Sequence, residues 1–168
     1  MSEFRVLFIY PNQRAESLVP PALAIFSRLL KDRGIEVRLF DTSYYDIDAD
    51  DYFVAPRSKS SEKALSDLLM ARPYASRAES LKKHISAVDY LVALVDSFNP
   101  NLIAVTATES TFLLAVHLLR AVRHTEIPTV VGGVFPTFAP QRAISFPEVD
   151  MICVGEGEQA IVDLCENM

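Results

Sequence analysis

The sequence contains no tryptophan, only two cysteines and only five glycines among its 168 residues. Cys153 and Cys165 are too few for a disulfide framework or a metal cage, so we interpret both as buried thiols of a reduced, cytoplasmic protein. No apolar run approaches the ~20 residues that span a bilayer, and the apolar stretch at 6–10 is too short for a signal peptide. We therefore expect neither a disulfide-stapled domain nor a membrane partner.

Positive charge is also scarce, because 16 Lys and Arg stand against 22 Asp and Glu, for a net charge of −6. Nucleic acids and anionic membrane surfaces attract basic patches, so this balance argues against both as partners. Half of the residues are hydrophobic, which is incompatible with a disordered chain. The length fits one domain over 1–168 with a core of its own.

Apolar segments alternate with helical patterns along most of the chain. Segments rich in β formers, which we predict to be strands, lie at 4–10, 35–40, 102–107, 129–131 and 151–154. Apolar residues at helical spacing predict helices at 20–31, 81–98, 112–123 and 158–166. In the second of these helices, Ile85, Val88, Val92 and Val95 share the apolar rhythm. The segment 41–80 has no clean period, and we treat it as an irregular insertion with a short helix at 62–71.

The predicted strands are continuously apolar, which is typical of a parallel sheet covered by helices on both faces. Five such strands alternating with helices predict an α/β fold, a flavodoxin-like (Rossmann-like) three-layer sandwich with strand order 2-1-3-4-5. In such sheets ligands bind beyond the carboxyl ends of the strands, at the switch point between strands 1 and 3.

Glycines and hydroxyls gather at these carboxyl ends. Four of the five glycines follow the fourth and fifth strands, where they either form tight turns or let a bulky ligand touch the backbone. Thr106, Thr108 and Ser110 follow the third strand and can bond a polar ligand or cap the next helix. Gly155-x-Gly157-x-x-Ala160 formally fits a dinucleotide fingerprint, but it follows the last strand and no later strand carries the ribose-binding acid.

Two segments resemble the amino-terminal domain of cobalamin-dependent radical SAM proteins: VVGGVFPTFAP at 130–140 and DMICVGEGEQAIVDL at 150–164. In that family a strand ends in Gly-Gly, usually followed by a His or similar residue and then Pro-Thr. An Asp, a short strand and Gly-Glu-Gly-Glu come later. The opening RVLFIYPN and the segment VTATEST also fit. The matching positions of this sequence are Gly132, Gly133, Pro136, Thr137, Asp150, Gly155, Glu156, Gly157 and Glu158.

The resemblance implies a cobalamin-binding domain with its cofactor at the carboxyl edge of the sheet. It also implies that the glycines let the backbone approach the corrin, so that Gly133→Val would block binding and leave the fold intact. We assign no catalytic residue and no metal ligand. The residues expected to contact cobalamin are Asn12, Gln13, Thr106, Thr108, Glu109, Ser110, Gly132, Gly133, Val134, Phe135, Gly155, Glu156 and Gly157.

The sequence departs from related cobalamin proteins in lacking Asp-x-His-x-x-Gly after the first strand. Its histidines, His84, His117 and His124, fall on predicted helices. We therefore expect base-off cobalamin without a histidine on cobalt, its dimethylbenzimidazole tail lying between strands 1 and 3.

The Cys-x-x-x-Cys-x-x-Cys motif that holds a radical SAM iron–sulfur cluster is also absent. We therefore expect a domain excised from a larger methyltransferase or cyclase, whose carboxyl-terminal radical SAM domain would carry a 4Fe-4S cluster and S-adenosylmethionine. The alternatives are a cobalamin-free scaffold that docks such a domain, and a small nucleotide-binding enzyme that uses the Gly155 loop.

Overall fold

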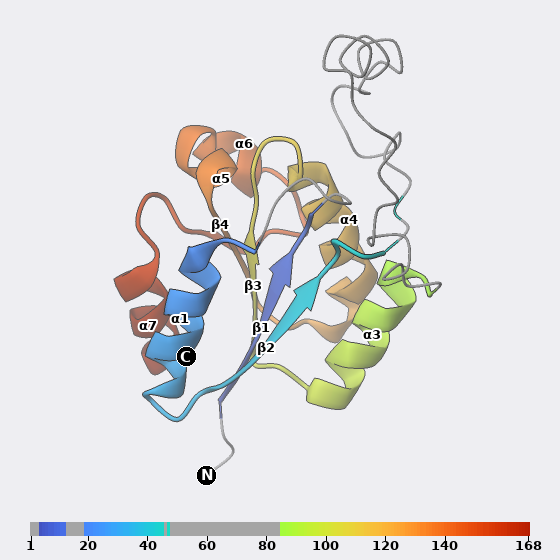
Figure 1. Cartoon of the computed structure of the whole chain (residues 1–168). Coiled ribbons are helices and arrows are strands. Elements are labelled where there is room, and N and C mark those ends of the chain that lie inside the picture. Colours follow the sequence, from blue (N-terminus) through green and yellow to red (C-terminus); the bar gives the residue numbers. More distant parts are fainter. Residues whose placement is uncertain (1–3, 13–18, 46, 48–84) are drawn as a thin grey trace, which may run out of the picture.

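The computed structural model describes residues 4–12, 19–45, 47 and 85–168 (Figure 1). Its described strands form one parallel sheet in the order β2-β1-β3-β4-β5. This order confirms the predicted fold, including the switch point between β1 and β3. The strands are β1 (Arg5–Tyr10), β2 (Glu36–Asp41), β3 (Leu102–Thr106), β4 (Thr129–Gly132) and β5 (Met151–Ile152).

Helices cover both faces of the sheet, as Figure 1 shows. One face carries α1 (Pro21–Lys31) and α7 (Glu158–Asn167), and the opposite face carries α3 (Ala87–Phe98) and α4 (Phe112–Val122). A short 3-10 helix, η3 (Arg123–Thr125), leads from α4 toward β4. The short helices α5 (Val134–Phe138) and α6 (Pro140–Ile144) follow the carboxyl end of β4.

Side chains alternate between two separate cores along the central strands, because successive residues of a strand point to opposite faces. Leu7 and Ile9 of β1 join the larger core under α3 and α4. Val6 and Phe8 join the smaller core under α1 and α7. The larger core makes the side under α3 and α4 the densely filled face of the sheet, and the smaller core makes the side under α1 and α7 the less filled face.

Local sequence signals explain where the helices begin and end. Proline occupies the first position of α1, where its missing N–H costs nothing. The Ser86 side chain accepts a hydrogen bond from the Asp89 N–H (3.3 Å) and so caps α3. Asn99 ends α3 in the left-handed region, at φ 47°.

The structure corrects details of the predicted elements. The fifth strand is only two residues long, so Cys153 lies beyond it and is only half-buried. Ile85 precedes α3 and is 50% exposed, because the helix begins only after the Ser86 cap. Cys165 is buried, as predicted. The helix predicted at 62–71 lies outside the described residues.

Candidate functional site

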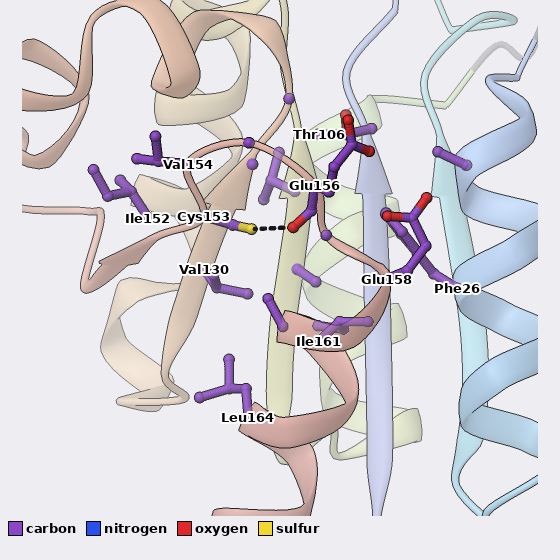
Figure 2. Close-up of a pocket in the computed structure, with 18 of the residues that line it drawn as sticks. Phe26, Thr106, Val130, Ile152, Cys153, Val154, Glu156, Glu158, Ile161 and Leu164 are labelled. Carbon is purple, nitrogen blue, oxygen red and sulfur yellow. Dashed lines mark hydrogen bonds between the residues drawn. The ribbon is translucent and has the colours of Figure 1, made fainter.

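A cavity of about 540 Å³ lies between the less filled face of the sheet and helices α1 and α7 (Figure 2). Its floor is formed by Phe8, Ala104 and Val130, from β1, β3 and β4. Ile161 and Leu164 of α7 line it from the helix side. The cavity reaches the carboxyl edge of the sheet, where Gly155 and its neighbours are exposed.

Small side chains explain why this face is hollow. Ala104 lies at the centre of the floor, paired in register with Phe8 on one side and Val130 on the other. Ala22 of α1 and Ala160 of α7 also line the cavity. Three alanines, brought together from three elements, therefore leave space between layers that larger side chains would fill.

The loop between β5 and α7 forms the rim, and Thr137 attaches it to the loop after β4. The Gly155 N–H donates to the Thr137 hydroxyl oxygen (3.1 Å), and that hydroxyl donates to the Gly133 carbonyl (2.8 Å). One side chain thus joins the two glycine-bearing loops. The Cys153 thiol also donates to the Glu156 carbonyl within the rim (3.8 Å), the bond drawn in Figure 2.

Glycine occupies each position at this edge for a different structural reason. Gly133 has φ +101°, and a Cβ there would lie 2.7 Å from the carbonyl oxygen and 2.9 Å from the nitrogen of Ala107. Gly133 is therefore required by the close approach of β3 and β4, and the expectation that Gly133→Val leaves the fold intact is wrong. Gly155 has φ +85° and nothing within 4 Å of the Cβ position, so its bare backbone faces open space.

Gly157 makes room for an aromatic ring. A Cβ on Gly157 would lie 2.9 Å from the tip of the Phe26 ring. Phe26 extends from α1 and stacks on Phe8, with ring centroids 6.2 Å apart and planes at 29°. The ring therefore lies between α1, the sheet and the rim loop, and it lines the cavity.

The structure brings together six of the residues expected at the site, which all line the cavity: Thr106, Gly132, Gly133, Gly155, Glu156 and Gly157. Asn12 lies elsewhere and is only 2% exposed. Its backbone N–H donates to the Thr42 hydroxyl (2.6 Å) and its side-chain amide donates to the Ser43 hydroxyl (2.7 Å). Asn12 thus ties the end of β1 to the end of β2, and Gln13 lies outside the described residues.

The remaining expected residues do not line the cavity. Thr108, Glu109 and Ser110 are exposed beyond β3, where the Thr108 hydroxyl lies 3.0 Å from that of Ser110. Val134 is 57% exposed on α5. The Phe135 ring packs against the Phe112 ring of the opposite core, with centroids 4.3 Å apart.

The polar groups of the cavity gather at its rim. Glu156, Glu158 and the half-buried Cys153 lie there, and Thr106 contributes the hydroxyl at the end of β3. Burial, with a smaller effect of the Glu158 carboxylate, raises the pKa of the Cys153 thiol. The thiol is therefore protonated at neutral pH, and the rim carries negative charge from the two glutamates.

Neither described histidine reaches this edge. His117 lies on α4, on the opposite face, and burial together with the charge of Arg120 lowers its pKa. His124 lies on η3, which precedes β4 and so belongs to the amino edge of the sheet. Among the described residues no three His, Cys, Asp or Glu side chains are grouped to hold a metal ion. In the same part of the chain, no helix has the length and apolarity to cross a membrane.

Sequence reasoning missed the apolar lining, because its residues are scattered and resemble ordinary core. One signal was present: β3 carries alanine at a central position among larger apolar neighbours, and so small a side chain leaves space in the core. The missed lining residues include Phe8, Ala22, Leu23, Phe26, Ala104, Val130, Cys153, Ala160, Ile161 and Leu164.

A family model described as the B12 binding domain matches residues 75–165 of the chain. No curated protein matches the sequence. The structure resembles that of the radical S-adenosylmethionine methyltransferase TsrM from Kitasatospora setae with tryptophan substrate and a SAM analogue bound. This comparison has a TM-score of 0.59 and 17% identity, and covers 96% of this chain and 25% of that chain.

The TsrM structure with cobalamin and a [4Fe-4S] cluster bound gives a TM-score of 0.60 at 17% identity, covering 98% of this chain and 26% of that chain. At this identity the likeness shows a shared fold. The chain spans about a quarter of the length of these two structures.

Proposed function

The chain belongs to the B12-binding domain family, and on that premise we propose that it holds cobalamin at the carboxyl edge of the sheet, with the dimethylbenzimidazole of the nucleotide tail inside the cavity. The observation that carries the proposal is the apolar cavity beneath the loop that contains Gly155. Its volume of about 540 Å³ lies within the range of about 300–1,000 Å³ usual for ligand pockets.

The lining of the cavity suits an aromatic base. Burying an aromatic group removes about 150–250 Å² from water, which corresponds to about 4–6 kcal/mol at about 25 cal/mol per Å². The walls that would contact the base are carbon-rich, from Phe8, Val130 and Ile161. The tail would therefore supply much of the binding free energy, whereas an exposed corrin ring alone would bind weakly.

The residues at the rim suit the polar periphery of the corrin. Cobalamin carries amide side chains, whose N–H groups donate to carboxylates such as those of Glu156 and Glu158. The exposed backbone of Gly155 leaves space for the macrocycle to approach. Thr106 lines the cavity at the end of β3, and its hydroxyl would bond the sugar or phosphate of the tail where the tail enters.

This arrangement favours the base-off form of the cofactor. A base held between the sheet and the helices cannot also coordinate a cobalt ion that lies outside the carboxyl edge. His117 and His124 lie away from that edge, so neither would replace the base as a ligand. The chain's part is to bind and orient the cofactor, and cobalamin would supply the organometallic chemistry.

We extend the proposal to the setting of the domain. The resemblance in motifs and the TsrM fold support a domain of a larger methyltransferase or cyclase, paired with a radical SAM domain. The two isolated cysteines favour a reduced, cytoplasmic setting. That partner would supply the 4Fe-4S cluster and bind S-adenosylmethionine, because Cys153 and Cys165 cannot hold a cluster.

Titration with hydroxocobalamin tests the proposal. We expect the chromophore to stay with the protein on gel filtration, with a base-off absorption spectrum after reduction to cob(II)alamin. Absence of retention well above micromolar concentration would refute the proposal and favour the cobalamin-free scaffold. Protection from proteolysis by a nucleotide, without protection by cobalamin, would favour the nucleotide-binding enzyme.

A further inference from the structure

The polar groups of the cavity are distributed unevenly, which bears on the ligand that it accepts. The lining at the carboxyl edge carries the hydroxyl, thiol and carboxylates already described. Deeper in, the described lining side chains are apolar, among them Leu23, Val130, Ile161 and Leu164. The backbone groups of the central strands are occupied in sheet pairing. A base that enters fully therefore meets few hydrogen-bonding partners at its inner edge.

Natural corrinoids differ in the base at the end of the nucleotide tail. In the base-off form, dimethylbenzimidazole has one unsubstituted ring nitrogen, whereas adenine has three and an amine. Polar groups buried without partners weaken binding, by roughly 1–3 kcal/mol each in proteins. On the basis of the proposed function, the cavity should therefore distinguish corrinoids by their lower base.

Phe26 lines the cavity on the α1 side. Its ring stacks on Phe8 and its tip fills the space left by the absent side chain of Gly157. Phe26 thereby bridges α1 and the rim loop that leads into α7. Without this ring, water could enter and solvate the polar edge of a bound base.

We propose that the cavity selects corrinoids with an apolar benzimidazole as lower base, and that Phe26 determines this selectivity by excluding water from the base. The proposal assigns Phe26 a specificity role in binding. It requires that the effect of Phe26 depend on which base the ligand carries.

The experiment compares three probes on the full chain: cobalamin, the analogue with adenine as lower base, and cobinamide, which has no nucleotide tail. Affinity is measured by absorbance titration for wild type, Phe26→Ala and Phe26→Leu. Ile25→Ala is the matched control, because Ile25 is the preceding residue of α1, is 47% exposed and does not line the cavity. Circular dichroism and thermal unfolding check that each variant is folded.

For wild type we expect cobalamin to bind at least about tenfold more tightly than the adenine analogue. Phe26→Ala should reduce this ratio to less than about threefold and leave cobinamide affinity unchanged, because cobinamide has no base to discriminate. Phe26→Leu should give an intermediate ratio, and Ile25→Ala should behave as wild type.

Equal wild-type affinity for the two bases would overturn the inference and leave cobalamin binding itself intact. An equal loss of affinity for all three probes in both Phe26 variants would also overturn it, since that result describes a purely structural residue. Failure of every corrinoid to bind wild type would instead refute the proposed function on which the inference rests.

Discussion

Ala104→Leu should make the protein more stable and bind cobalamin more weakly, a combination expected only where a side chain fills a functional cavity. Ala104 is 4% exposed and lies at the centre of the cavity floor. Leucine adds three carbon atoms, worth up to about 2.4 kcal/mol at about 0.8 kcal/mol each. Restriction of its rotamers opposes this by about 0.5–1 kcal/mol.

The net expectation is a gain of about 1–2 kcal/mol in the free energy of unfolding, within the range typical of cavity filling. For a domain of this length, each 1 kcal/mol raises Tm by about 2–4 °C. The base would now meet an overpacked site, which costs about 1–3 kcal/mol, so affinity for hydroxocobalamin should fall by about 5- to 150-fold. Thermal unfolding without ligand and absorbance titration measure the two effects separately.

Ala115→Leu is the matched control, because Ala115 is 1% exposed in the densely filled core under α4. The same substitution there should lower stability by about 1–3 kcal/mol and leave the affinity of the folded protein unchanged. If Ala104→Leu also lowered Tm, the space beside it would not be a void. If it kept wild-type affinity, the base would bind elsewhere.

Three further outcomes follow from the rim and the start of β5. Gly133→Ala should lower the free energy of unfolding, measured in urea, by about 2 kcal/mol or more, because the positive φ and the close backbone after β3 both oppose a Cβ. Gly155→Ala should cost only about 1 kcal/mol, because its φ is positive but its Cβ would meet open space. Equal losses in the two variants would contradict this account. Because its pKa is raised, the Cys153 thiol should react with iodoacetamide slowly at neutral pH and faster as the pH rises. Saturating hydroxocobalamin should slow this reaction. Burial raises the pKa of Cys165 to about 11, so Cys165 should stay unmodified and serve as the internal control in mass spectrometry. Asp150→Asn should lower stability at neutral pH. Partial burial raises the carboxyl pKa, but hydrogen bonds from Arg123 and Thr129 outweigh this effect and hold the pKa below the ordinary 3.8. The carboxylate therefore stabilises the fold above pH 3.8, and the stabilities of wild type and variant should converge as the pH falls through the lowered pKa.

The fold could be predicted from the sequence because most strands are apolar runs and the longer helices have an apolar stripe. In contrast, β2 carries Glu36 and Arg38, and the short helices α5 and α6 were not predicted. The seven buried residues of α4, for example, include four that recur at helical spacing: Ala115, Leu118, Leu119 and Val122. Strand order followed from the number of strands and their alternation with helices. These signals are local, so they survive without knowledge of the tertiary structure.

The site was only half predictable, because its shape depends on residues that become neighbours only in the fold. Glycine spacing indicated the edge of the sheet, but it could not show that a Cβ on Gly133 would clash with the backbone of Ala107. Asn12 was expected to contact cobalamin, but it is buried and its hydrogen bonds go to the end of β2. The ring of Phe26 had no local signal that distinguished it from core packing.

The two faces of the sheet give neighbouring positions of one strand different tasks. In β1, Leu7 and Ile9 belong to the tight core, whereas Phe8 between them borders the cavity. Amino-acid changes at every second position can therefore alter what the domain binds while the intervening positions keep it folded. Ligand preference in this architecture can thus diverge during evolution by single substitutions, without an accompanying compensation in the opposite core.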